Sequence, residues 1–164
     1  MSRLLDTTIP VGGDVIDVAE DRFTGSPDIW LADDVRPHGA SWQGEVRVGR
    51  LRRPVHVDVG APWLRGQTVS RAIAWTPVRR VEGDGTVTDG RLPAFTGQIS
   101  LRRDPTGAAW LRLVGTYDPP GGAVGNALDA LLLHKVAEVT ASQMLGDIEG
   151  RLTAPADEPV LAAP

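Results

Sequence analysis

Charged side chains stand among apolar ones in two parts of this chain. Arg71 alternates with apolar residues in a segment of period two, and Lys135 and Glu138 project between leucine and valine positions of a long helical segment. In an apolar cavity, such groups could orient the carbonyl, phenolate or carboxylate of a ligand, and a proton transfer would need a side chain of this kind with a shifted pKa. The structural alternative is that Arg71 pairs with an internal carboxylate, while Lys135 and Glu138 reach solvent at the helix flank.

Other kinds of site have little support in the sequence. The three histidines, His38, His56 and His134, are isolated, and the pair His56-x-Asp58 offers at most two metal ligands on one strand face. Cysteine is absent, which excludes a disulfide, a thiol nucleophile and a thiolate metal site. No serine lies in a G-x-S-x-G setting, and the glycines of residues 121–125 lack both a GKS/T motif and a βαβ unit continuing after the helix. We therefore expect no metal and no cofactor.

One long helix and a run of strands must position the charged groups. The segment from Tyr117 to Leu152 is periodic in apolar residues and has no proline after its first turn residues, which predicts a helix of roughly 28 to 30 residues beginning near residue 124. Its two halves carry differently oriented apolar faces, so this helix should contact two surfaces or bend. The face of the second half is formed by Ala141, Leu145, Ile148 and Leu152.

The rest of the chain has the pattern of a sheet with two short helices near its start. Residues 4–11 predict a first strand, and residues 14–23 and 26–31 predict short helices, the second with serine as N-cap and proline at its first position. From residue 41 to residue 117 apolar and polar residues alternate with period two, interrupted by a loop at residues 60–66 and by turn sequences. The connections are too short for parallel crossovers, so we expect six or seven antiparallel strands.

Length and composition indicate one domain. The chain has 164 residues, of which 41% are hydrophobic, and we place the domain at residues 1–152 and a disordered tail at residues 153–164. The net charge of -4 and a pI near 5.3 argue against nucleic acid as the main partner. No run approaches the roughly 20 apolar residues of a membrane-spanning helix. Because the N-terminus also lacks a signal-peptide core and cysteine is absent, we expect a cytoplasmic protein without an integral membrane segment.

Two local motifs carry a family resemblance over roughly residues 4–152. The stretch Tyr117-x-Pro-Pro-Gly-Gly-x-x-Gly125-x-x-Leu128-Asp129, followed by the helix, resembles the final strand-to-helix junction of bacterial polyketide cyclase/dehydrase-like proteins. These belong to the SRPBCC superfamily, which includes START and birch-pollen-allergen-like proteins. A second similarity is IPV at the end of the first strand, then a short helix and Asp28-x-Trp30-Leu31.

The resemblance implies an α+β helix-grip fold, in which a curved antiparallel sheet of six or seven strands wraps around the long C-terminal helix. It also implies a deep, mostly apolar cavity between sheet and helix. Families with this fold bind lipids, sterols, polyketides or other hydrophobic ligands, and some catalyse cyclisation or dehydration. The residues that we expect to line such a cavity are Arg71, Trp75, Phe95, Ile99, Tyr117, Leu128, Leu132, Lys135, Glu138 and Val139.

Three functional hypotheses follow. The first is a protein that binds a hydrophobic small molecule of lipid, polyketide or aromatic type. The second is a polyketide cyclase or dehydratase that uses Arg71, Lys135 or Glu138 for polarisation and proton transfer. The third is an interaction protein with a collapsed cavity, and a homodimer stays open as an alternative to a monomer. For the architecture, we expect one buried sheet-helix interface that contains Phe95, Ile99, Leu111, Leu113, Leu128, Leu132 and Val139.

Overall fold

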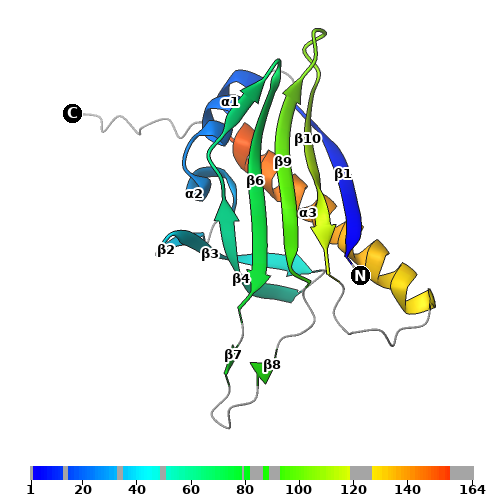
Figure 1. Ribbon diagram of the computed structural model, residues 1–164. Coiled ribbons are helices and arrows are strands. Elements are labelled where there is room, and N and C mark those ends of the chain that lie inside the picture. The colour runs from blue at the N-terminus through cyan, green and yellow to red at the C-terminus, as the bar shows by residue number, and fades with distance from the viewer. Residues whose placement is uncertain are drawn as a thin grey trace.

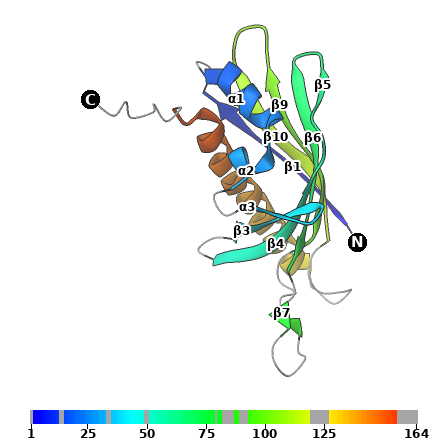
Figure 2. The ribbon, with the colours of Figure 1, turned by 90° about the vertical axis from the view of Figure 1, so that its left-hand side faces the viewer.

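A curved antiparallel sheet lies against one long helix. The computed structural model describes residues 2–12, 15–32, 35–48, 51–78, 80–81, 87–88, 93–118 and 127–155, and this part of the chain contains ten strands and three helices (Figure 1). The view along the sheet shows all three helices on the same side of it (Figure 2). The sheet therefore has an inner face toward the helices and an outer face on the other side.

The elements follow the order that the sequence predicts, with additional short strands. In chain order they are β1 (Arg3–Val11), α1 (Ile16–Thr24), α2 (Pro27–Trp30), β2 (Arg36–His38), β3 (Ser41–Val48), β4 (Leu51–Val59), β5 (Trp63–Arg65), β6 (Thr68–Pro77), β7 (Arg80–Val81), β8 (Val87–Thr88), β9 (Phe95–Arg103), β10 (Ala109–Tyr117) and α3 (Ala127–Thr153). Ser26 is the N-cap of α2 and Pro27 opens it, as predicted. The chain at residues 119–126, where we expect α3 to begin, and the tail at residues 156–164 lie outside the described residues.

The main sheet has the strand order β1-β10-β9-β6-β4-β3-β2, and β5 pairs with β6 as an eighth strand. The prediction of six or seven strands misses β5, which we assigned to a loop. Every strand pair is antiparallel. The first strand, β1, pairs along its whole length with the last, β10, so the two ends of the β pattern meet at one edge of the main sheet.

The hairpin between β9 and β10 shows how local sequence sets the register. Asp104 Oδ1 accepts hydrogen bonds from the Thr106 N–H (2.8 Å), the Thr106 hydroxyl (2.6 Å) and the Ala108 N–H (3.1 Å). Gly107 follows with a φ of 89°, a conformation that glycine adopts without steric cost. This turn fixes the long pairing of Phe95–Arg103 with Ala109–Tyr117.

Alternation along the strands places the core on the inner face, as predicted. Phe95, Ile99, Leu111 and Leu113 are buried, which confirms their place in the core. On α3 the predicted face of Ala141, Leu145, Ile148 and Leu152 is buried too.

Val139 does not belong to this interface, because 49% of its surface is exposed. At 3.6 residues per turn, Val139 lies about half a turn away from the buried Ile148, so both cannot face the sheet on a straight helix. The prediction for Val139 is therefore wrong. The side chains of Leu128 and Leu132 lie outside the described residues, and their burial stays a prediction.

Arg22, on α1, holds the C-terminal end of α3. Its Nη1 donates hydrogen bonds to the backbone oxygens of Arg151 (2.9 Å), Leu152 (3.0 Å) and Ala154 (2.5 Å). The last carbonyls of a helix have no partner within the helix, and a cation there also complements the helix dipole. Within the described residues, no helix is both long and apolar enough to cross a membrane.

Candidate functional site

Arg71 lies on the inner face of β6, where the period-two pattern places it. Its neighbours on that face, Val69, Ile73 and Trp75, are buried, and Arg71 itself is only 6% exposed. The guanidinium donates to the backbone oxygens of Gly60 (2.8 Å), Phe23 (3.0 Å) and Gly25 (2.7 Å). Its central carbon also lies 5.5 Å from the centre of the Trp30 ring.

These contacts give Arg71 a structural role. Two of its acceptors, Phe23 and Gly25, are carbonyls at the C-terminal end of α1, which need donors and favour a nearby positive charge, and the third, Gly60, directly follows β4. Burial lowers the pKa of Arg71 from its ordinary value, but arginine stays protonated, so the charge is stabilised by the carbonyls and by the Trp30 ring. A buried arginine must meet a carboxylate, carbonyls, water or a ligand, and among the described residues the partners of Arg71 are carbonyls and not a carboxylate.

A row of aromatic side chains crosses the inner face nearer the other end of the sheet. Trp75 pairs with Phe95 across β6 and β9, and Phe95 pairs with Tyr117 across β9 and β10. The Trp75 and Phe95 rings stack, with centroids 4.2 Å apart and planes 15° apart. The exposed fractions are 6%, 1% and 3% along the row, so these three side chains form a continuous buried aromatic wall.

Two glycines allow Phe95 to lie against the sheet. Gly97 and Gly115 are paired across β9 and β10, and a Cβ atom built on either would lie 2.7 Å or 2.6 Å from Phe95 Cζ. A larger residue at either position would also meet the backbone of the opposite strand. The glycines therefore set the depth of the aromatic wall.

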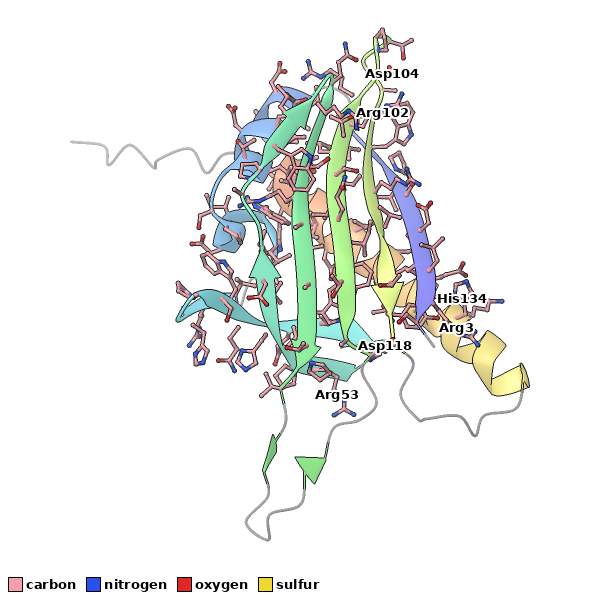
Figure 3. The ribbon with its side chains drawn as sticks, viewed as in Figure 1. Arg3, Arg53, Arg102, Asp104, Asp118 and His134 are labelled. Carbon is pink, nitrogen blue, oxygen red and sulfur yellow. The ribbon has the colours of Figure 1, made fainter. Side chains whose placement is uncertain are left out.

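Tyr117 ends this wall with a hydroxyl that contacts α3. The Tyr117 hydroxyl and His134 Nδ1 are 3.1 Å apart, and His134 Nε2 lies 3.4 Å from Glu138 Oε1, one helical turn further on. The side chains of His134 and Glu138 are 37% and 53% exposed. A chain of hydrogen-bonding groups thus runs from a buried phenol to solvent. Figure 3 shows His134 near Arg3, the residue paired with Tyr117 on β1.

The surroundings of Tyr117 keep its hydroxyl protonated. Burial raises the pKa of Tyr117 above its ordinary value, nearby Arg3 opposes this effect, and the Glu138 carboxylate adds to it. At neutral pH the phenol is therefore a donor as well as an acceptor of hydrogen bonds. A neutral phenol next to an imidazole and a carboxylate is an arrangement that can transfer protons.

The interior at the other half of α3 is closely packed. An apolar cavity of about 30 Å³ lies between the segment that follows α2, the strands β3, β4 and β6, and Met144 of α3, and Trp75 is one of its lining residues. This volume is roughly that of one water molecule in the liquid, too small for an organic ligand. The side chains at residues 127–133 and 136 of α3 lie outside the described residues.

The histidines are less isolated than the sequence suggests. The His38 and His56 rings approach to 5.2 Å between centroids, and His134 contacts Tyr117 and Glu138. In the described part of the chain, no group of three or more His, Cys, Asp or Glu side chains could hold a metal ion. We missed His134 as a site residue, although its i, i+4 spacing to Glu138 on the predicted helix was a usable signal.

Comparison with known proteins supports the fold. The structure is similar to a conserved protein from Geobacillus kaustophilus, with 12% sequence identity, a TM-score of 0.50, and coverage of 92% of this chain and 95% of that chain. The chain has the helix-grip fold. This is the fold that the resemblance to the SRPBCC superfamily implied.

Two further solved structures align over most of their length with this helix-grip chain. They are the Zhui aromatase/cyclase from Streptomyces sp. R1128 (14% identity, TM-score 0.49, 93% of this chain and 94% of that one) and a START superfamily protein from Mycobacterium smegmatis (9% identity, TM-score 0.48, 92% and 96%). No protein-family model and no curated protein matches the sequence.

The helix-grip structure brings together only part of the predicted cavity lining. Trp75, Phe95, Ile99 and Tyr117 are buried on the inner face, and Arg71 is buried there with its Nε and Nη1 atoms bonded to carbonyls. Lys135, Glu138 and Val139 are exposed on α3, although Glu138 joins the chain from Tyr117 through His134. Whether any of these residues contacts a ligand stays a prediction.

Proposed function

We propose that the protein binds a hydrophobic small molecule with an aromatic ring between the inner face of the sheet and α3, beside Tyr117. The observation that carries this proposal is the aromatic wall of Trp75, Phe95 and Tyr117, which lies on the inner face and ends in a hydroxyl. Ligand sites typically combine apolar and aromatic walls with a few placed polar groups. A flat ring stacked on this wall would bury apolar area, and the Tyr117 hydroxyl would orient one polar substituent.

The chemistry of Tyr117 indicates which substituent suits the site. A tyrosine hydroxyl is neutral at pH 7, and the raised pKa of Tyr117 extends this state to higher pH, so the group can donate to a carbonyl or exchange hydrogen bonds with a phenol. The wall is buried, so an ionised substituent would have to give up its hydration there, and this disfavours a charged group relative to a neutral one. The ligand class that fits best is therefore a neutral aromatic molecule that carries a hydroxyl or carbonyl group.

An acid-base enzyme is the second candidate, and the contacts of His134 favour it. In this hypothesis Tyr117 gives its proton to the oxygen of a bound carbonyl or enolate, and His134, together with Glu138, returns a proton from solvent to Tyr117. Cyclisation and dehydration of polyketide-like substrates need such steps. Of the three residues that we expected to do this, Glu138 is kept, whereas Arg71 is held by carbonyls and Lys135 is exposed.

Displacement of a fluorescent probe tests the binding proposal. The probe is 1-anilinonaphthalene-8-sulfonate, and the competitors are 1-naphthol and naphthalene, which differ by one hydroxyl. We expect saturable probe binding that both competitors displace. Tyr117→Phe should weaken the binding of 1-naphthol about five- to tenfold, since one net hydrogen bond is worth about 1 kcal/mol. The same substitution should leave the affinity for naphthalene unchanged.

Thr116→Val is the matched control, because Thr116 is the exposed neighbour of Tyr117 on the outer face of the same strand. This substitution should change the affinity for neither 1-naphthol nor naphthalene. Failure of both competitors to displace the probe, or equal weakening of both by Tyr117→Phe, would contradict the proposal. A complete absence of probe binding would favour the interaction protein with a collapsed cavity.

A further inference from the structure

A second hollow lies on the outer face of the sheet, opposite the helices. It has a volume of about 620 Å³ and is lined by Asp6, Thr8, Thr68, Gln98, Ser100, Arg102, Asp104, Trp110 and Arg112. These residues come from β1, β6, β9, β10 and the turn after β9, and on the strands they alternate with the buried inner residues. Figure 3 looks onto this face, with Arg102 and Asp104 labelled near the β9–β10 turn. We call this region the outer hollow.

Small residues in the two central strands create the outer hollow. Ser70 on β6 and Ser100 on β9 are cross-strand partners, and they are 3% and 8% exposed although they face away from the helices. Gln98 Nε2 donates to the Ser70 hydroxyl at 3.0 Å. Arg102 and Gln98 stand two residues on either side of Ser100, and Arg112 is its partner on β10. Longer side chains therefore surround a floor of hydroxyl groups.

The charged groups around this floor are balanced. Arg112 makes two hydrogen bonds to Asp6, from Nε to Oδ1 (2.8 Å) and from Nη2 to Oδ2 (2.5 Å), which fixes the planes of both side chains. Asp104 is bonded into its own turn. Arg102 is exposed, and the hydrogen bond from Thr106 and the charge of Arg102 both lower the pKa of Asp104. Two arginines and two aspartates thus line the hollow, and their formal charges cancel.

We propose that the outer hollow binds a neutral saccharide. Sugar hydroxyls both donate and accept, and the lining supplies carboxylate and amide acceptors together with guanidinium, amide and hydroxyl donors. Trp110, which is half-buried and lines the hollow, supplies an indole ring that could contact the C–H side of a sugar ring. The cancelled charge disfavours a strongly anionic ligand, and the volume falls within the range of small-molecule sites.

Saturation-transfer NMR on the full chain tests this proposal with a panel of glucose, galactose, mannose, N-acetylglucosamine, maltose and cellobiose. We expect at least one of these sugars to bind saturably. Trp110→Ala should weaken the binding of that sugar at least tenfold, because the substitution removes the indole ring that contacts it. Ser100→Val should weaken it as well, since valine suits a strand, fills the floor and removes the hydroxyl.

Thr116→Val, on β10 but outside the lining of the outer hollow, should leave sugar binding unchanged, and probe binding in the interior should persist in all three variants. Sugar binding that survives both Trp110→Ala and Ser100→Val would overturn the proposal. So would the absence of binding by every sugar, or saturable binding of inorganic phosphate in their place, which would make this an anion site.

Discussion

At the scale of single residues, Arg71 and Tyr117 show what the alternation of residues along a strand can predict and what it cannot. Period two places both side chains on the inner face, and this is confirmed. Their partners could not be predicted, because Phe23, Gly25 and His134 come from other elements of the chain. A buried arginine needs acceptors, but the sequence does not say whether they are carboxylates or backbone oxygens.

Arg71→Met should lower the free energy of unfolding by about 3 kcal/mol, because it leaves buried carbonyls without donors. Urea unfolding measures this change, and 1-naphthol binding to the folded variant should persist. Arg65→Met is the control, since Arg65 is exposed on β5, and it should change stability by less than about 0.5 kcal/mol. Loss of ligand binding with unchanged stability would instead make Arg71 a ligand anchor.

Tyr117 is the one tyrosine of the chain, so its ionisation can be followed directly by tyrosinate absorbance. We expect the pKa of Tyr117 in the folded protein to lie above the ordinary tyrosine value of about 10. Since the folded state then holds the proton more tightly than the unfolded chain, this stabilisation is complete below about pH 10 and is lost as pH rises through the folded pKa. Tyr117→Phe should remove that alkaline loss. A midpoint at or below the value of the unfolded chain would contradict the assigned environment.

At the scale of elements, the helix α3 was predicted in type and length more reliably than in orientation. Its second-half face was correct because Ala141, Leu145, Ile148 and Leu152 form one stripe. The position of Val139 was wrong because an apolar residue in a helix need not join the stripe that is buried. Only contacts with the sheet decide between two competing faces.

Leu145→Ala and Val139→Ala test this orientation on the same helix. Leu145→Ala should lower the free energy of unfolding by about 2 to 5 kcal/mol, because Leu145 is fully buried and its truncation leaves a cavity in a packed interface. Val139→Ala should lower the free energy of unfolding by less than about 1 kcal/mol, because Val139 is half exposed. Thermal or urea unfolding gives both values. Similar costs at the two positions would mean that the helix is rotated relative to the orientation described above.

At the scale of the whole molecule, the sequence predicted the helix-grip fold but not the neighbours of every strand. Alternation and short connections indicate antiparallel hairpins such as β9–β10. The pairing of β1 with β10 joins segments about a hundred residues apart, and no local pattern specifies it. The Tyr117–His134–Glu138 chain and the outer hollow depend on such distant pairings, so neither could be found from spacing alone.

The central claim is that a neutral aromatic ligand lies against Trp75, Phe95 and Tyr117 between the sheet and α3. Intermolecular NMR cross-relaxation between bound 1-naphthol and the aromatic protons of the protein tests this claim most directly. We predict contacts from the naphthol ring to these three side chains and none to Trp110 on the outer face. Contacts confined to Trp63 or Trp110, with none to the aromatic wall, would contradict it.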